Sequence, residues 1–226
     1  MGNVKLSGEQ VRKVEAAVRE SEKKTSAEIA VAMIRESSDY ARYELLAAVI
    51  FGLVYFTALA VFTPWLEAWL QTLTWSYSAT ILVAASGFST FLVIAITYFL
   101  ANLAPIDRWI VPRRIMVEQV RRRAMRHFLE AVVHRTRERN GMLIFLSRLE
   151  RRIEIVTDIG ISDRIPRSTW EGVLNELSSG LKRGDPGDAL AQAVTRCGEI
   201  LAVHFPPRPD DINELKDSVH LLGNGS

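Results

Sequence analysis

Two aspartates are the first candidates for chemistry in this sequence. Asp158 and Asp163 flank Gly160, just beyond an apolar segment typical of a β-strand. Loops that follow strands often hold the sites of α/β domains. Two carboxylates there could bind a divalent cation, calcium or magnesium, or act as acid and base on a phosphoester. The alternative is structural, and the pattern favours it: Asp158 would end the strand and Asp163 would cap a short helical turn.

A charged run, Glu150, Arg151 and Arg152, precedes that segment and is a second candidate, for ligand binding. A pair of guanidinium groups could clamp a phosphate. A charged turn between two strands is also an ordinary solvated structure, and this second interpretation is the commoner one.

Histidine and cysteine give little support for a metal centre or a nucleophile. His127 and His134 lie two helical turns apart, beyond the spacing of a chelating pair, and Glu130 with His134 is more typical of an exposed ion pair. Cys197 is the sole cysteine, which we expect in the core of a helix. No phosphate-cradling glycine loop or nucleophile elbow is present. The sequence therefore does not establish an enzyme.

A third group of candidates is a set of arginines on one expected helix: Arg113, Arg114, Arg121, Arg122 and Arg123. Clustered arginine binds phosphate, either of nucleic acid or of anionic lipid. The cluster begins shortly after a long apolar segment and lacks interleaved aromatic residues. We therefore expect contact with a membrane surface and no nucleic acid partner.

The apolar segments themselves predict a transmembrane hairpin over residues 39–112. Residues 45–62 and 78–104 contain no charge, and each is long enough to cross a bilayer. Pro64 and Pro105 are expected to end the two spans. Tyrosine and tryptophan gather at both ends of the runs, as at headgroup level.

Charge predicts the orientation of this hairpin. The connector between the spans, residues 63–77, has no Lys or Arg, whereas both flanks are rich in them. Positive residues are retained on the cytoplasmic side. Residues 1–6 also lead directly into a charged helical pattern, without the features of a signal peptide. We expect two spans in the inner (plasma) membrane with both termini cytoplasmic.

The remaining residues, 1–38 and 113–205, are expected to form one discontinuous α/β domain. Its small mixed sheet, of three or more strands, must be covered by helices. The strand at 28–34 needs a partner beyond the hairpin, and we expect it to be 142–147. Capping boxes are expected at Ser7 and Ser168, and residues 206–226 are expected to be a flexible polar tail. The expected elements are helices at about 7–24, 113–139, 168–183 and 186–204, and strands at 28–34, 142–147 and 152–157.

The runs Arg139–Ser147 (RNGMLIFLS) and Leu149–Val156 (LERRIEIV), followed by Gly160, resemble the core motif of the TPM-domain family. The resemblance implies a compact α/β sandwich. Members of that family include thylakoid-lumen proteins of photosystem repair, some of them acid phosphatases, and a receptor-associated membrane protein. This chain departs from the soluble members in its hairpin and in the short segment Asp158–Asp163, which stands in place of a longer glycine- and acid-rich stretch.

Two functions follow as hypotheses. The first is a membrane-anchored TPM-like domain that acts as an interaction or assembly-support module at the cytoplasmic face. Its partners would be the lipid bilayer and another membrane protein, and oligomerisation is left open. The second is a divalent-cation-dependent phosphatase that uses Asp158 and Asp163. Transport is disfavoured because the spans carry no intramembrane charge.

Overall fold

The computed structural model describes residues 6–73, 79–101, 109–131, 133, 136, 138–208 and 218–222. The chain divides into two compact units. One consists of Met1–Ser38 together with Arg114–Ser226 and is an α/β domain. The other, Asp39–Arg113, contains a pair of apolar helices.

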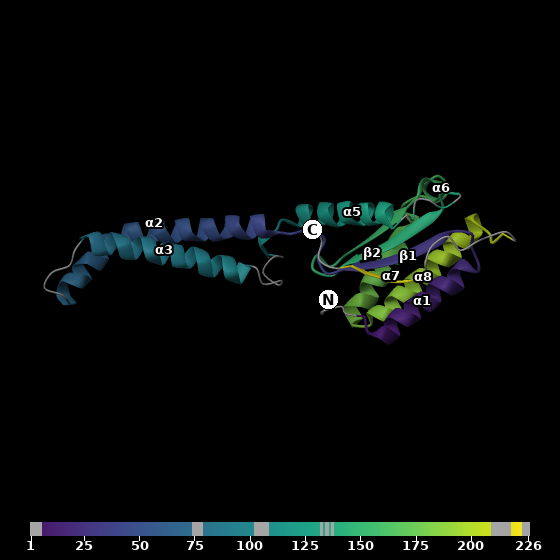
Figure 1. Ribbon diagram of the computed structural model, residues 1–226, viewed down its shortest axis with the longest axis horizontal. Coiled ribbons are helices and arrows are strands. Elements are labelled where there is room, and N and C mark those ends of the chain that lie inside the picture. Colours follow the sequence, from purple (N-terminus) through teal and green to yellow (C-terminus); the bar gives the residue numbers. More distant parts are fainter. Residues whose placement is uncertain are drawn as a thin grey trace. The chain divides into compact units, whose positions relative to one another are not determined.

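The α/β domain is built on a four-stranded sheet with strand order β3-β2-β1-β4 (Figure 1). The strands are β1 (Glu28–Ile34), β2 (Gly141–Ser147), β3 (Arg152–Thr157) and β4 (His220–Leu222). β1 is parallel to β2 along its whole length and to β4 at its end, whereas β3 is antiparallel to β2. The expected pairing of the first strand with a strand beyond the hairpin is confirmed, as is the mixed α/β class.

Helices cover both faces of this sheet (Figure 1). α1 (Gly8–Glu22), α7 (Thr169–Arg183) and α8 (Pro186–His204) lie on one face, and α5 (Arg113–Glu130) lies on the other. Both faces of β1 and β2 are therefore buried, which explains why these strands are apolar throughout rather than alternating.

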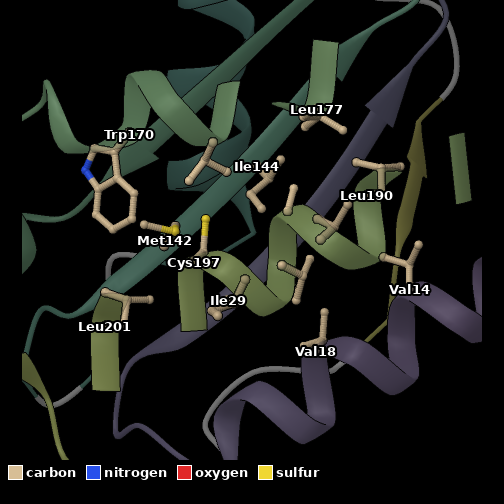
Figure 2. Packing of buried hydrophobic residues seen from close by; sticks show 14 of the residues in the cluster. Val14, Val18, Ile29, Met142, Ile144, Trp170, Leu177, Leu190, Cys197 and Leu201 are labelled. Carbon is tan, nitrogen blue, oxygen red and sulfur yellow. The ribbon is translucent and has the colours of Figure 1, made fainter. Parts of the chain in front are cut away.

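Alternate side chains of the central strands enter two separate hydrophobic clusters. Ile29 and Met142 face α1, α7 and α8, where they pack with Leu201 and Cys197 (Figure 2). Cys197 is fully buried on α8, as expected, and burial raises the pKa of its thiol to about 12. On the opposite face, α5 supplies the following residues to a smaller cluster with Phe145: Val120, Ala124 and Phe128.

The helix termini follow the capping boxes expected from the sequence at Ser7 but not at Ser168. Ser7 and Gln10 form the reciprocal capping box that begins α1. Asp185 caps α8 by accepting a hydrogen bond from the N–H of Asp188 at 3.2 Å. The capping box expected at Ser168 is wrong: this residue has helical dihedrals (φ −60°, ψ −25°) and its side chain makes no cap bond. A backbone turn, in which the Thr169 N–H donates to the Pro166 carbonyl at 3.0 Å, leads into α7 instead.

α5 is shorter than the sequence pattern predicted. It ends at Glu130 rather than near residue 139, and Val133 and Thr136 are buried outside it. Val133 packs in the cluster around Phe145, beside the start of β2. Only glycine fits opposite it, because a Cβ atom on Gly141 would lie 2.0 Å from the Val133 carbonyl oxygen. Val132 lies outside the described residues.

The tail also differs from its expectation. Residues 220–222 form β4, an edge strand beside β1, so this part of the segment 206–226 has regular structure. Leu222 packs against the cluster around Phe145, which gives the short strand an apolar anchor. Residues 209–217 and 223–226 lie outside the described residues.

The second unit contains α2 (Ala41–Leu73) and α3 (Ala79–Ala101). Both include stretches long and apolar enough to cross a membrane, Ala41–Trp69 and Thr80–Ala101. Their large apolar side chains are mostly exposed, in contrast to those of a soluble core.

The expectation that Pro64 ends the first span is wrong, because α2 continues through it. Proline removes one backbone donor, and membrane-type helices tolerate this loss when neighbouring groups compensate. Beside it, the Thr63 hydroxyl donates to the Leu59 carbonyl at 2.8 Å. Pro105, which was expected to end the second span, lies outside the described residues.

Candidate functional site

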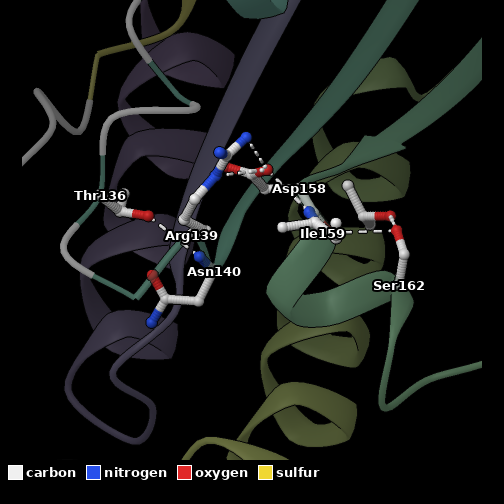
Figure 3. A network of polar contacts seen from close by, with 7 residues as sticks. Thr136, Arg139, Asn140, Asp158, Ile159 and Ser162 are labelled. Atoms are coloured by element: carbon white, nitrogen blue, oxygen red, sulfur yellow. Dashed lines mark hydrogen bonds and ion pairs between the residues drawn. The ribbon is translucent and has the colours of Figure 1, made fainter.

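Asp158 and Asp163 occupy opposite ends of α6 (Ile159–Ser162), a helix of a single turn. Asp158 directly follows β3, is buried, and caps α6 by accepting a hydrogen bond from the Ile159 N–H at 2.7 Å (Figure 3). Asp163 is exposed, and its backbone N–H donates to the Ile159 carbonyl at 2.9 Å. Asp158 therefore ends β3, as the structural interpretation expected, but it also provides the side-chain cap of α6 that was expected of Asp163.

The Asp158 carboxylate is already occupied by a cation, the guanidinium of Arg139 (Figure 3). Arg139 Nη2 lies 3.1 Å from Oδ1, and Nε lies 3.2 Å from Oδ1 and 3.3 Å from Oδ2. A metal ion at Asp158 would have to displace this guanidinium. Among the described residues, no group of three or more His, Cys, Asp or Glu side chains is placed to hold a metal ion. This donor set does not fit a divalent cation.

The motif residues around Asp158 join neighbouring loops. The Asn140 amide donates to the Ser26 carbonyl at 2.5 Å, which ties the start of β2 to the start of β1. A Cβ atom on Gly160 would lie 2.6 Å from the Glu138 carbonyl oxygen, so only glycine allows α6 to approach this loop so closely. Asn140 and Gly160 of the motif therefore have packing roles in this chain.

The second candidate, Glu150–Arg152, lies at the turn between β2 and β3, and Arg152 is the first residue of β3. Glu150 is buried rather than solvated: its Oε1 accepts from the Ser37 N–H at 2.8 Å, and its Oε2 accepts from the Ser147 hydroxyl. A backbone hydrogen bond adds to this contact: the Leu149 N–H donates to the Arg35 carbonyl at 2.8 Å. Glu150 thus links the turn to the end of β1.

Arg151 and Arg152, in contrast, are exposed, and Arg151 has a left-handed backbone (φ 51°). Arg35 and Arg148 lie in the same region, since the Leu149 N–H binds the Arg35 carbonyl, so the backbone brings four arginines to this turn and the adjacent end of β1. Burial lowers the pKa of Arg148, and the nearby charge of Arg35 lowers it further.

The third candidate group lies on α5. The side chains of Arg113, Arg114, Arg121 and Arg122 are exposed, but that of Arg123 is only 16% exposed and pairs with Glu130 at 3.1 Å. Arg123 therefore does not belong to the outer basic face. The sequence pattern missed two exposed apolar side chains on that face, Met125 and Leu129.

The structure also reveals a histidine pair that the sequence did not predict. His127 Nε2 lies 3.1 Å from His220 Nδ1, which joins α5 to β4. The pKa of His127 falls to about 4 because its ring is buried, and because His220 and Arg123 lie nearby. His134, the partner considered from the sequence, lies outside the described residues.

These features define an α/β domain with a continuous four-stranded sheet, in which the chain between the neighbouring strands β1 and β2 contains two helices long and apolar enough to cross a membrane. Residues 110–200 match the model of the TPM domain family. The NMR structure of the BA42 protein from the psychrophilic bacterium Bizionia argentinensis is similar, with a TM-score of 0.58 and 19% sequence identity over 98% of this chain and 99% of that chain. This likeness shows the fold. No curated protein matches the chain.

Proposed function

We propose that this chain is a TPM-type domain anchored by two spans at the cytoplasmic face of the inner membrane, where it supports the assembly of another membrane protein without catalysing a reaction. One observation carries the proposal: β1 and β2 are neighbours in the sheet, and the chain between them contains both candidate spans. The domain is therefore attached to the hairpin at two points of its own core.

Attachment at two points has a consequence for partners. Both crossings return the chain to one compact domain, so both ends of the hairpin lie on one side of the bilayer. The absence of Lys and Arg from residues 63–77 favours the cytoplasm for that side. A domain confined in this way meets lipids and other membrane proteins before it meets soluble partners.

Phosphatase activity is the alternative, and the family resemblance is its main support. The environment of Asp158 argues against it, since this carboxylate is held by Arg139 and by the N-terminus of α6. The exposed Asp163 alone offers too few ligands for a divalent cation.

Topology is tested with a reporter that is active only outside the cytoplasm. Fusion at Thr72 should give activity, and fusion at residue 226 should give none. The opposite pattern would overturn the proposed orientation.

Catalysis is tested with the purified full-length chain in detergent, a generic phosphoester, and magnesium or calcium. We expect turnover no higher than in protein-free buffer. Turnover that depends on metal and is lost in Asp158→Asn, with unchanged thermal unfolding, would replace the assembly role by the phosphatase.

A further inference from the structure

The turn between β2 and β3 gathers positive charge at the point where the chain leaves the α/β domain. Arg148, Arg151 and Arg152 belong to this turn, and Arg35 is held beside it by the Leu149 N–H. Arg35, Arg151 and Arg152 are exposed, and Arg148 is partly exposed. We call these four residues the arginine turn.

Two acidic residues, Glu36 and Glu150, lie in the same segments as the four arginines, which leaves a formal charge of +2. Glu150 points inward and is buried against Ser37 and Ser147. Glu36 is partly buried. The exposed part of the turn is therefore dominated by guanidinium groups, which bind phosphate through two parallel hydrogen bonds.

Chain connectivity places the arginine turn close to the start of the first candidate span. Glu150 binds the backbone of Ser37, and the candidate span begins at Ala41. An extended residue covers about 3.6 Å, so Ala41 lies within about 14 Å of Ser37 along the chain. The uncharged stretch begins at Leu45, one helical turn later, or about 6 Å further.

We propose that the arginine turn is a binding surface for the phosphates of anionic lipid headgroups, and that it holds the domain against the bilayer. This inference rests on the membrane anchoring proposed above and names one partner of the anchored domain. Headgroup layers extend roughly 5–7 Å beyond the hydrocarbon core on each side, and the surface potential acts over about 8 Å more at physiological salt. The tether through Ser37 is short enough to bring the guanidinium groups into that zone.

The experiment places a fluorophore on the turn in the full-length chain and measures its contact with lipid. Leu149→Cys is a suitable site, because the side chain of Leu149 is accessible in part. Its contact with Arg35 is made by the backbone, which the substitution leaves in place. Cys197 is fully buried and should stay unlabelled. A label at Val203→Cys, on an exposed position of α8, serves as the control within the same domain. Both proteins are reconstituted in nanodiscs whose lipids carry a headgroup-level quencher, with or without phosphatidylglycerol.

The charge is then removed by Arg151→Asn with Arg152→Gln, since asparagine tolerates the left-handed backbone of residue 151. The doubly conservative variant Arg151→Lys with Arg152→Lys keeps the charge. Lys182→Gln with Arg183→Gln removes the same charge from the exposed end of α7 and is the matched control.

We expect quenching at position 149 to exceed that at 203, and to require phosphatidylglycerol. Removing both arginines should weaken the association with the anionic bilayer by about tenfold or more, whereas the lysine variant and the α7 control should retain it. Relief of quenching by inorganic phosphate at millimolar concentration would identify free phosphate as the ligand and overturn the lipid assignment. Equal quenching in both bilayers, or in the variant without arginines, would show that the tether alone places the turn and would also overturn the proposal. Failure of the chain to enter nanodiscs would instead refute the membrane anchoring.

Discussion

Glu150 accepts a hydrogen bond from the backbone N–H of Ser37 at 2.8 Å, although 113 positions separate the two residues in the chain. Ser37 lies one residue before the end of the first segment of the α/β domain. The carboxylate therefore fixes the point from which the chain departs towards α2. Its burial makes this contact stronger than a surface hydrogen bond would be.

Replacing Glu150 by alanine should lower the stability of the α/β domain and loosen the backbone at Ser37. The Ser37 N–H and the Ser147 hydroxyl would lose an ionised acceptor, at a cost of about 2–3 kcal/mol in the free energy of unfolding. Amide hydrogen exchange at Ser37 should accelerate as well. Glu150→Gln, which keeps the acceptor, should lose less, and Glu171→Ala on the exposed side of α7 should change neither quantity. A stable Glu150→Ala variant with unchanged exchange at Ser37 would contradict this role.

Phe128 tests the second hydrophobic cluster. Phe128 lies on α5, is 4% exposed and packs in the cluster that contains Phe145 of β2. Phe128→Ala should therefore cost about 3–5 kcal/mol in the stability of the α/β domain. Phe56→Ala removes a ring that is 49% exposed within α2, and it should leave the unfolding of that domain almost unchanged. Chemical unfolding of the full chain in detergent measures both. Comparable losses would mean that the two units unfold as one cooperative core.

Two glycines give opposite predictions for the same substitution. Gly160→Ala should destabilise the domain by more than 1 kcal/mol, because the new Cβ would lie 2.6 Å from a backbone oxygen and the loop before β2 would have to move. Gly172→Ala, within α7 and with open space around it, should stabilise by about 0.5–1 kcal/mol. Thermal unfolding of the two variants against the parent compares them directly. A loss in both, or a gain in both, would refute the packing role of Gly160.

His127 predicts a pH dependence of stability. The pKa of this histidine is about 4 in the folded chain and about 6.5 when unfolded. Between these values the unfolded chain binds a proton that the folded chain excludes, so stability falls as the pH falls from about 6.5 to about 4, and it is unaffected above that range. We expect a loss on the order of 2–3 kcal/mol across this range.

The measurement is the difference in unfolding free energy between the parent chain and His127→Gln, taken at several pH values. This difference should change through the acidic range and stay constant above about pH 7. A difference that does not vary with pH would show that the buried ring is protonated in the folded chain as readily as in the unfolded one.

The central strands could be predicted from the sequence because burial on both faces leaves an apolar run, and the termini of α1 and α8 because their caps are local. β4 could not, since three residues carry no periodicity and His220–Leu222 form a strand only beside the edge of β1. The His127–His220 pair has the same origin, a contact between segments 93 residues apart. The environment of Asp158 also escaped prediction, because a left-handed residue, Arg139, supplies its partner from another loop.

The parallel pairing of β1 with β2 also sets an order for biosynthesis. A ribosome completes β1, then both apolar helices, and only then β2, so the first strand has no partner while the hairpin is being made. Closing a flexible loop of that length carries an entropic cost that grows with its length. A hairpin already inserted in the bilayer would replace most of this loop by a rigid element whose ends return to one surface. Membrane insertion would then precede domain folding and guide it, and a chain whose insertion failed would expose an unpaired, wholly apolar strand to solvent.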